Sequence, residues 1–113
     1  MQKILIVDDV EINRELLRNI LKEDYMIEMA ENGEEALAKL TVWHHRISAI
    51  LLDLQMPKMD GFTVIAQLKE QGLIGKIPVL IISSEHAVEI ENRCFELGVS
   101  DFIHKPFVSS IVK

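Results

Sequence analysis

The chain has 113 residues and a formal net charge of −6, which suits one small acidic domain with a single core and argues against nucleic acid as a partner. Hydrophobic residues make up 49% of it, enough for a packed globule. Cys94 is the one cysteine, so an internal disulfide is excluded and a reducing compartment is expected. No apolar run reaches membrane-spanning length and no signal peptide fits before the first strand, so we expect a cytoplasmic protein without membrane contact.

Strands and helices are predicted to alternate along the whole chain. Apolar runs predict strands at residues 3–7, 25–29, 48–53, 77–82 and 100–104. Their hydrophobicity is continuous rather than alternating, which is typical of parallel strands buried on both faces. Helices are predicted between them at residues 11–22, 34–43, 61–71 and 86–97. Because crossovers between parallel strands are right-handed, this order predicts a doubly wound α/β fold with a five-stranded parallel sheet.

The predicted helices carry recognisable faces and ends. The first is amphipathic: its apolar face is formed by Ile12, Leu16, Leu17, Ile20 and Leu21, and its outer face by Glu11, Arg14, Arg18 and Lys22. Asn32-Gly33 precedes the second helix, and Asp60 is expected to cap the third. Gly98 is expected to end the fourth in a left-handed conformation.

Three aspartates follow or end predicted strands. Asp8 and Asp9 come after the run KILIV, and Asp53 ends the run AILLD. The carboxyl ends of the strands of such a sheet meet at one edge, where ligands bind, so we expect the three carboxylates to lie together. Like charges in one crevice require a compensating cation or a chemical role. A hydroxyl, Ser83, and an ammonium, Lys105, end or follow two further strands at the same edge.

This set of residues resembles the receiver domain of two-component response regulators. The spacings match: 44 residues from Asp9 to Asp53, 30 from Asp53 to Ser83 and 22 from Ser83 to Lys105. The matching positions are Asp8-Asp9, Asp53, Met56-Pro57, Asp60-Gly61, Ser83, Gly98, Phe102 and Lys105-Pro106. Each motif alone is weak, but together they cover the chain in the family's order. The resemblance implies a flavodoxin-like (βα)5 fold with strand order 2-1-3-4-5.

The residues and the resemblance together predict a role for each site group. Asp53 is the expected phosphoacceptor, because carboxylates form acyl-phosphates when nearby charge is neutralised. Asp8, Asp9 and Asp53 are expected to hold Mg²⁺, which prefers oxygen ligands. The resemblance adds the backbone carbonyl of Gln55 as a ligand. Lys105, which precedes a family cis-proline, and Ser83 are expected to bind phosphoryl oxygens.

The implied function is a phosphorylation-operated switch rather than an enzyme. A sensor histidine kinase or phosphotransfer protein would donate the phosphoryl group to Asp53. Ser83 would then move inward and Phe102 would rotate, changing the surface of helix four and strand five that an output domain or partner reads. A phosphorylation-dependent homodimer is compatible with this interpretation.

One departure from the family concerns the end of the chain. Only seven residues follow Pro106, which form about two helical turns at most, whereas receivers have a full fifth helix packed beside the first. We therefore expect residues 1–113 to be a receiver domain with a truncated fifth helix, cut from the N-terminal part of a longer protein. The alternative is that the face of helix one is poorly covered.

Other interpretations of the same residues are weaker. A phosphatase of the dehalogenase type needs an acid two residues after the first aspartate, where this chain has Val10. A pseudo-receiver would lack some of the five site groups, and all five are present. A flavin or nucleotide module is disfavoured because the loop DDVEIN is anionic and lacks glycine. Taken singly, the aspartates also suit helix caps or turns, and Phe102 also suits the core.

Overall fold

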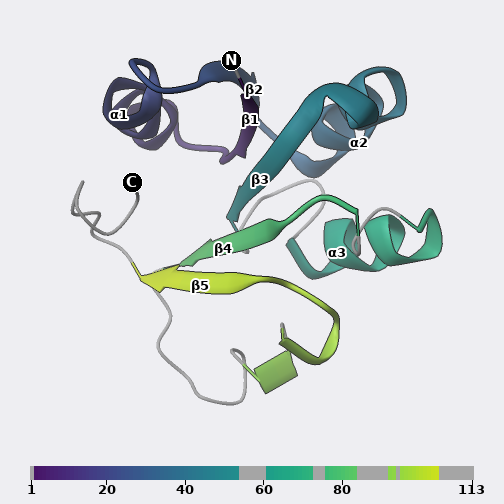
Figure 1. The fold of residues 1–113 in the computed structure, drawn as a ribbon. Helices are drawn as coiled ribbons and strands as arrows, with labels where there is room; N and C mark the ends of the chain where they lie inside the picture. The colour runs from purple at the N-terminus through teal and green to yellow at the C-terminus, as the bar shows by residue number, and fades with distance from the viewer. Residues whose placement is uncertain (1, 54–60, 73–75, 84–91, 94, 105–113) are drawn as a thin grey trace.

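The computed structural model describes residues 2–53, 61–72, 76–83, 92–93 and 95–104. Strands and helices alternate along these residues, as Figure 1 shows. They are β1 (Lys3–Val7), α1 (Glu11–Leu21), β2 (Met26–Ala30), α2 (Gly33–Trp43), the short 3-10 helix η1 (His44–Arg46), β3 (Ile47–Asp53), α3 (Gly61–Glu70), β4 (Val79–Ser83) and β5 (Asp101–His104).

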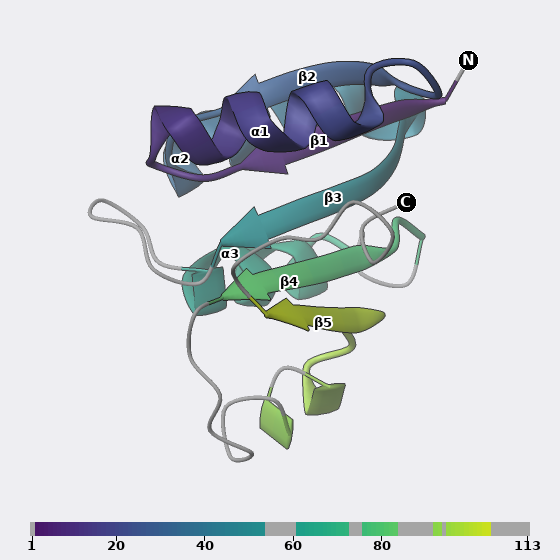
Figure 2. The ribbon, with the colours of Figure 1, turned by 90° about the vertical axis from the view of Figure 1, so that its left-hand side faces the viewer.

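The five strands form one parallel sheet in the order β2-β1-β3-β4-β5. All their carboxyl ends lie at the same edge, as the arrowheads in Figure 2 show. The predicted fold class and strand order are therefore confirmed. The truncated fifth helix falls at residues 105–113, outside the described residues.

Helices cover both faces of the sheet, with α1 on one face and α2 and α3 on the other (Figures 1 and 2). Alternate strand residues point to opposite faces, so each strand supplies two separate cores. On β1, Ile4 and Ile6 pack with the α1 core, whereas Leu5 and Val7 pack with the core under α2 and α3. This two-sided burial explains why the strands are continuously apolar in sequence.

The predicted helix ends are confirmed where the structure describes them. Asn32 Oδ1 accepts a hydrogen bond from the backbone N–H of Glu35 at 2.9 Å, which caps α2. Gly98 has φ 103° and donates its N–H to the carbonyl of Phe95 at 3.0 Å, which ends the last turn of the fourth predicted helix. Most of that helix and Asp60 lie outside the described residues.

The predicted buried face of α1 is partly wrong. Leu17 and Leu21 are buried, but Ile12 is 78% exposed and Leu16 is 43% exposed. Residues 17 and 21 form one stripe along the helix, and residues 12 and 16 form another about 140° around the helix axis from it. The first stripe lies on the sheet, so the second is turned largely away from it.

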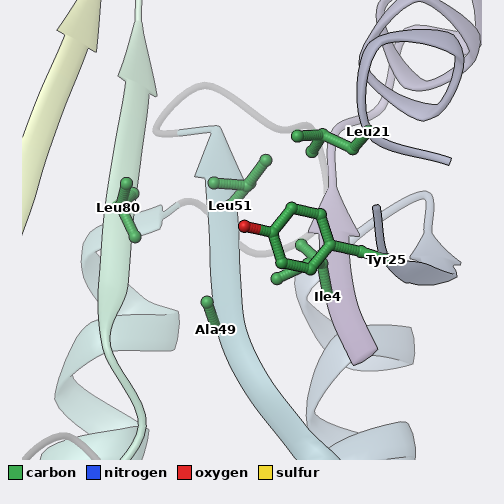
Figure 3. Close-up of a pocket in the computed structure, with 6 residues that line it drawn as sticks. All are labelled: Ile4, Leu21, Tyr25, Ala49, Leu51 and Leu80. Carbon is green, nitrogen blue, oxygen red and sulfur yellow. The ribbon is translucent and has the colours of Figure 1, made fainter. Parts of the chain in front are cut away.

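An apolar hollow of about 130 Å³ lies beside α1 on the same face of the sheet. Figure 3 shows Tyr25 lying across it, with its hydroxyl directed toward β3. The lining side chains are Ile4, Leu21, Tyr25, Ala49, Leu51 and Leu80. The resemblance implies that a fifth helix packs on this face of the sheet, beside α1. The hollow and the exposed stripe of α1 lie on the face that this helix would cover.

Candidate functional site

The register of the sheet brings Asp8 and Asp53 side by side. Val7 of β1 pairs with Leu52 of β3, so the next residue of each strand lies at the carboxyl edge. Asp8 and Asp53 are both buried, at 1% and 4% exposure, whereas Asp9 is exposed. Carboxylate oxygens of the three lie within 4.8 Å of one another. The structure thus brings together the three aspartates that the sequence singled out.

This cluster concentrates negative charge in a partly buried place. Two unit charges 4.8 Å apart repel by about 3 kcal/mol at an effective dielectric constant of about 20. A divalent cation offsets such repulsion, and Mg²⁺ takes carboxylate oxygens while retaining several waters. The donor set therefore fits Mg²⁺, held directly or through water.

Asp8 is held by hydrogen bonds from three directions. Its N–H donates to the carbonyl of Ala30 at 3.1 Å, which extends the pairing of β1 with β2. Its Oδ1 accepts from the N–H of Val10 at 2.9 Å, and its own carbonyl accepts from Arg14 Nη1 at 2.7 Å. The N-cap position of α1 is Val10, so neither Asp8 nor Asp9 is the N-cap residue. The side chain of Asp8 instead forms an Asx turn, in which its Oδ1 accepts a hydrogen bond from the N–H two residues later.

Sequence reasoning missed Arg14. It was placed on the outer face of α1, but it is half-buried and its guanidinium bonds to the carbonyl of a site residue. Helical periodicity locates only where the Cα–Cβ bond points, and a long arginine side chain folds back across a turn. No motif in the sequence marks this contact.

The other predicted site residues are described in part or not at all. Asp53 pairs with Ile82, so Ser83 follows one residue further along at the end of β4, opposite His104 of β5. Phe102 pairs with Ile81 on the neighbouring strand. Ser83 therefore ends β4 and Phe102 lies within β5, while their roles at the site remain predictions. Gln55 and Lys105 lie outside the described residues.

Comparisons with known proteins agree with this geometry. Residues 4–112 match the family described as response regulator receiver domain. The chain is 34% identical over 110 residues to the two-component response regulator ORR5 of Oryza sativa subsp. japonica, covering 96% of this chain and 81% of the relative. It is 41% identical over 106 residues to the transcriptional regulatory protein ResD of Bacillus subtilis, covering 93% of this chain but only 42% of ResD.

A solved structure is similar over almost the whole chain. It is the CheX-CheY-BeF3-Mg²⁺ complex from Borrelia burgdorferi, with a TM-score of 0.90 and 30% sequence identity. The similarity covers 98% of this chain and 83% of that one.

The chain belongs to the response regulator receiver domains. It is therefore a signalling domain of two-component systems rather than an enzyme in the usual sense, and its family indicates a switch that depends on phosphorylation. Receiver domains of this family interact with histidine kinases or phosphotransfer proteins and with output domains. Among the described residues, no helix is long and apolar enough to cross a membrane.

Proposed function

We propose that this domain is switched by transfer of a phosphoryl group to Asp53 from a histidine kinase or phosphotransfer protein. The observation that carries the proposal is the meeting of Asp8, Asp9 and Asp53 within 4.8 Å at the carboxyl edge of a receiver-type sheet. Asp53 suits the acceptor role because it ends the central strand β3, with a strand on each side of it.

The chemistry follows from the residues at this edge. A carboxylate oxygen of Asp53 attacks the phosphorus of the donor phosphohistidine while the phosphorus–nitrogen bond breaks and the imidazole leaves. Asp8, Asp9, Asp53 and the Gln55 carbonyl would hold Mg²⁺, and when bound this ion supplies positive charge that offsets the charge of carboxylate and phosphate. Lys105 and Ser83 would each bind a phosphoryl oxygen.

The switch itself would run through Ser83 and Phe102. Ser83 ends β4, the strand next to the one that Asp53 ends, and Phe102 lies on β5, the strand beyond. A change at Asp53 would therefore reach Phe102 through β4. Movement of Ser83 toward the phosphoryl group would allow Phe102 to rotate and change the surface of helix four and β5. A near-complete shift needs the phosphoryl group to favour the active state by about 5.5 kcal/mol.

The output is proposed from the relatives. The chain spans less than half of ResD, whose name describes a transcriptional regulator, so we propose that the switch controls an output domain or a separate partner. Residues 1–113 would then be the receiver part of a longer cytoplasmic protein. Homodimerisation on phosphorylation is compatible with this proposal.

The proposal is tested by phosphorylating the domain with acetyl phosphate and Mg²⁺ and weighing the intact protein. We expect one phosphoryl group on the wild type and on Asp101→Asn, whose altered carboxyl starts β5 at the opposite edge of the sheet. Asp53→Asn should take up none, because its amide oxygen carries no negative charge and is too weak a nucleophile to attack phosphorus. Equal labelling of Asp53→Asn and the wild type would overturn the assignment.

A further inference from the structure

A closed ring of three hydrogen bonds joins Asp8, Val10 and Arg14 at the start of α1. The N–H of Val10 donates to Asp8 Oδ1 at 2.9 Å. The N–H of Arg14 donates to the carbonyl of Val10 at 3.2 Å, the first turn of the helix. Arg14 Nη1 then reaches back to the carbonyl of Asp8 at 2.7 Å and closes the ring.

This ring fixes both the main chain and the side chain of Asp8. The backbone N–H of Asp8 is tied to β2 and its carbonyl to Arg14, so the peptide planes on both sides of it are set. A hydrogen bond from a charged guanidinium is about twice as strong as a neutral one. A ligand held in place before binding loses less conformational freedom when it binds.

We propose that Arg14 is a positioning residue of the cation site: it holds Asp8 in the orientation that faces Asp9 and Asp53 and so strengthens Mg²⁺ binding. The inference rests on the proposed function, since it concerns the same metal site. Arg14 does not touch the ion in this proposal, and it acts through Asp8.

The positive charge of Arg14 works against this effect, because a nearby cation repels Mg²⁺. The two effects predict opposite results when the side chain is removed: loss of positioning weakens binding, and loss of repulsion strengthens it. Arg14 is only half-buried, so solvent and salt screen its charge, whereas the ring of hydrogen bonds is short and local. The positioning effect therefore dominates.

Arg18 on the same helix provides a matched control. It carries the same charge one turn further along, is exposed, and pairs at the surface with Glu15 at 3.2 Å. Calorimetric titration with MgCl₂ should show about tenfold weaker binding for Arg14→Ala, equivalent to roughly 1.4 kcal/mol. Arg14→Lys keeps a charged donor and should recover most of the loss, and Arg18→Ala should stay within about twofold of the wild type.

A second measurement separates positioning from a merely structural role. In the metal-free protein, hydrogen exchange at the amide of Val10 should be faster in Arg14→Ala than in the wild type and unchanged in Arg18→Ala. All variants are compared at a temperature where circular dichroism shows them folded, so a general loss of stability does not alter the Mg²⁺ affinity.

The outcomes are distinguishable. Unchanged or tighter Mg²⁺ binding in Arg14→Ala would overturn the inference while leaving the metal site intact. Absence of Mg²⁺ binding by the wild type, or equal binding by Asp9→Ala, would instead overturn the proposed metal site and the inference with it. Weaker binding in Arg14→Ala together with faster exchange at Val10 supports the positioning role.

Discussion

Charged side chains in this domain are withdrawn from water in two different ways. Asp8 and Asp53 gather like charges at the carboxyl edge of the sheet, whereas Lys39 has opposite charges beside it. Lys39 Nζ lies 2.9 Å from Glu28 Oε1 and 3.4 Å from Glu35 Oε1, and it also donates to the carbonyl of Met29. Burial lowers the pKa of Lys39, but its contacts with Glu28 and Glu35 outweigh this effect and raise the pKa above 10.5.

Lys39→Gln should lower the free energy of unfolding by about 1 kcal/mol at neutral pH, because it removes charge-assisted bonds that tie α2 to the edge strand β2. The folded-state pKa of Lys39 is raised, so this contribution is complete below the ordinary pKa of 10.5 and is lost as the pH rises through the folded value. Urea unfolding at neutral and strongly alkaline pH checks this. The difference from the wild type should shrink only in alkali, and Lys22→Gln, at an exposed position, should show no such difference.

At the scale of elements, α1 is held by one stripe of its apolar residues. Leu17 and Leu21 pack against Ile4 and Ile6 of β1, whereas neighbouring apolar side chains of the same helix are exposed. Burial of a leucine side chain contributes about 1.5–3 kcal/mol, so the stripe on the sheet supplies most of the attachment of the helix. The amino-acid composition of α1 does not show which of its apolar residues are buried and which are exposed.

Leu17→Ala should therefore destabilise the domain by about 3 kcal/mol, since it leaves a cavity between α1 and the sheet. Leu16→Ala makes the same chemical change one residue earlier, where the side chain is 43% exposed, and should cost less than about 1 kcal/mol. Urea unfolding measures the loss of unfolding free energy in each variant, provided that the dependence of this free energy on urea concentration is the same in both. Similar losses would mean that both stripes of α1 are buried in solution.

At the scale of the whole molecule, the sheet links the acidic edge to its far strand. Asp53, Ser83 and His104 end three neighbouring strands, β3, β4 and β5, so a single strand lies between the strand that Asp53 ends and β5. A ligand shifts such an equilibrium only if it contacts the two states differently. Ser83, at the end of the middle strand, is the residue we propose to make that difference.

Ser83→Ala should still bind trifluoroberyllate and Mg²⁺ at Asp53, because it keeps all three carboxylates. Amide NMR shifts that the wild type shows across residues 95–104 on this addition should be largely lost in the variant. Ser48→Ala, at the opposite end of β3, serves as the control and should respond like the wild type. Equal shifts in Ser83→Ala and the wild type would show that the coupling runs through other residues.

The sequence alone determined the strands, most helix bounds and the meeting of Asp8, Asp9 and Asp53. Two physical rules made this possible: strands buried on both faces are continuously apolar, and the carboxyl ends of parallel strands share one edge. Both rules depend on local runs of residues, which are read directly along the chain. The capping of α2 by Asn32 and the left-handed Gly98 are local in the same way.

The tertiary structure alone decided which stripe of α1 is buried, that Arg14 bonds to the carbonyl of Asp8, and that Lys39 pairs with Glu28 of β2. Periodicity defines the faces of a helix but not its rotation on the sheet, which depends on all the side chains beneath it. Long side chains reach several ångströms from their Cα atoms, so their partners depend on how the elements pack. For this reason the carboxylates were foreseeable from the sequence, whereas the residue that holds Asp8 in place was not.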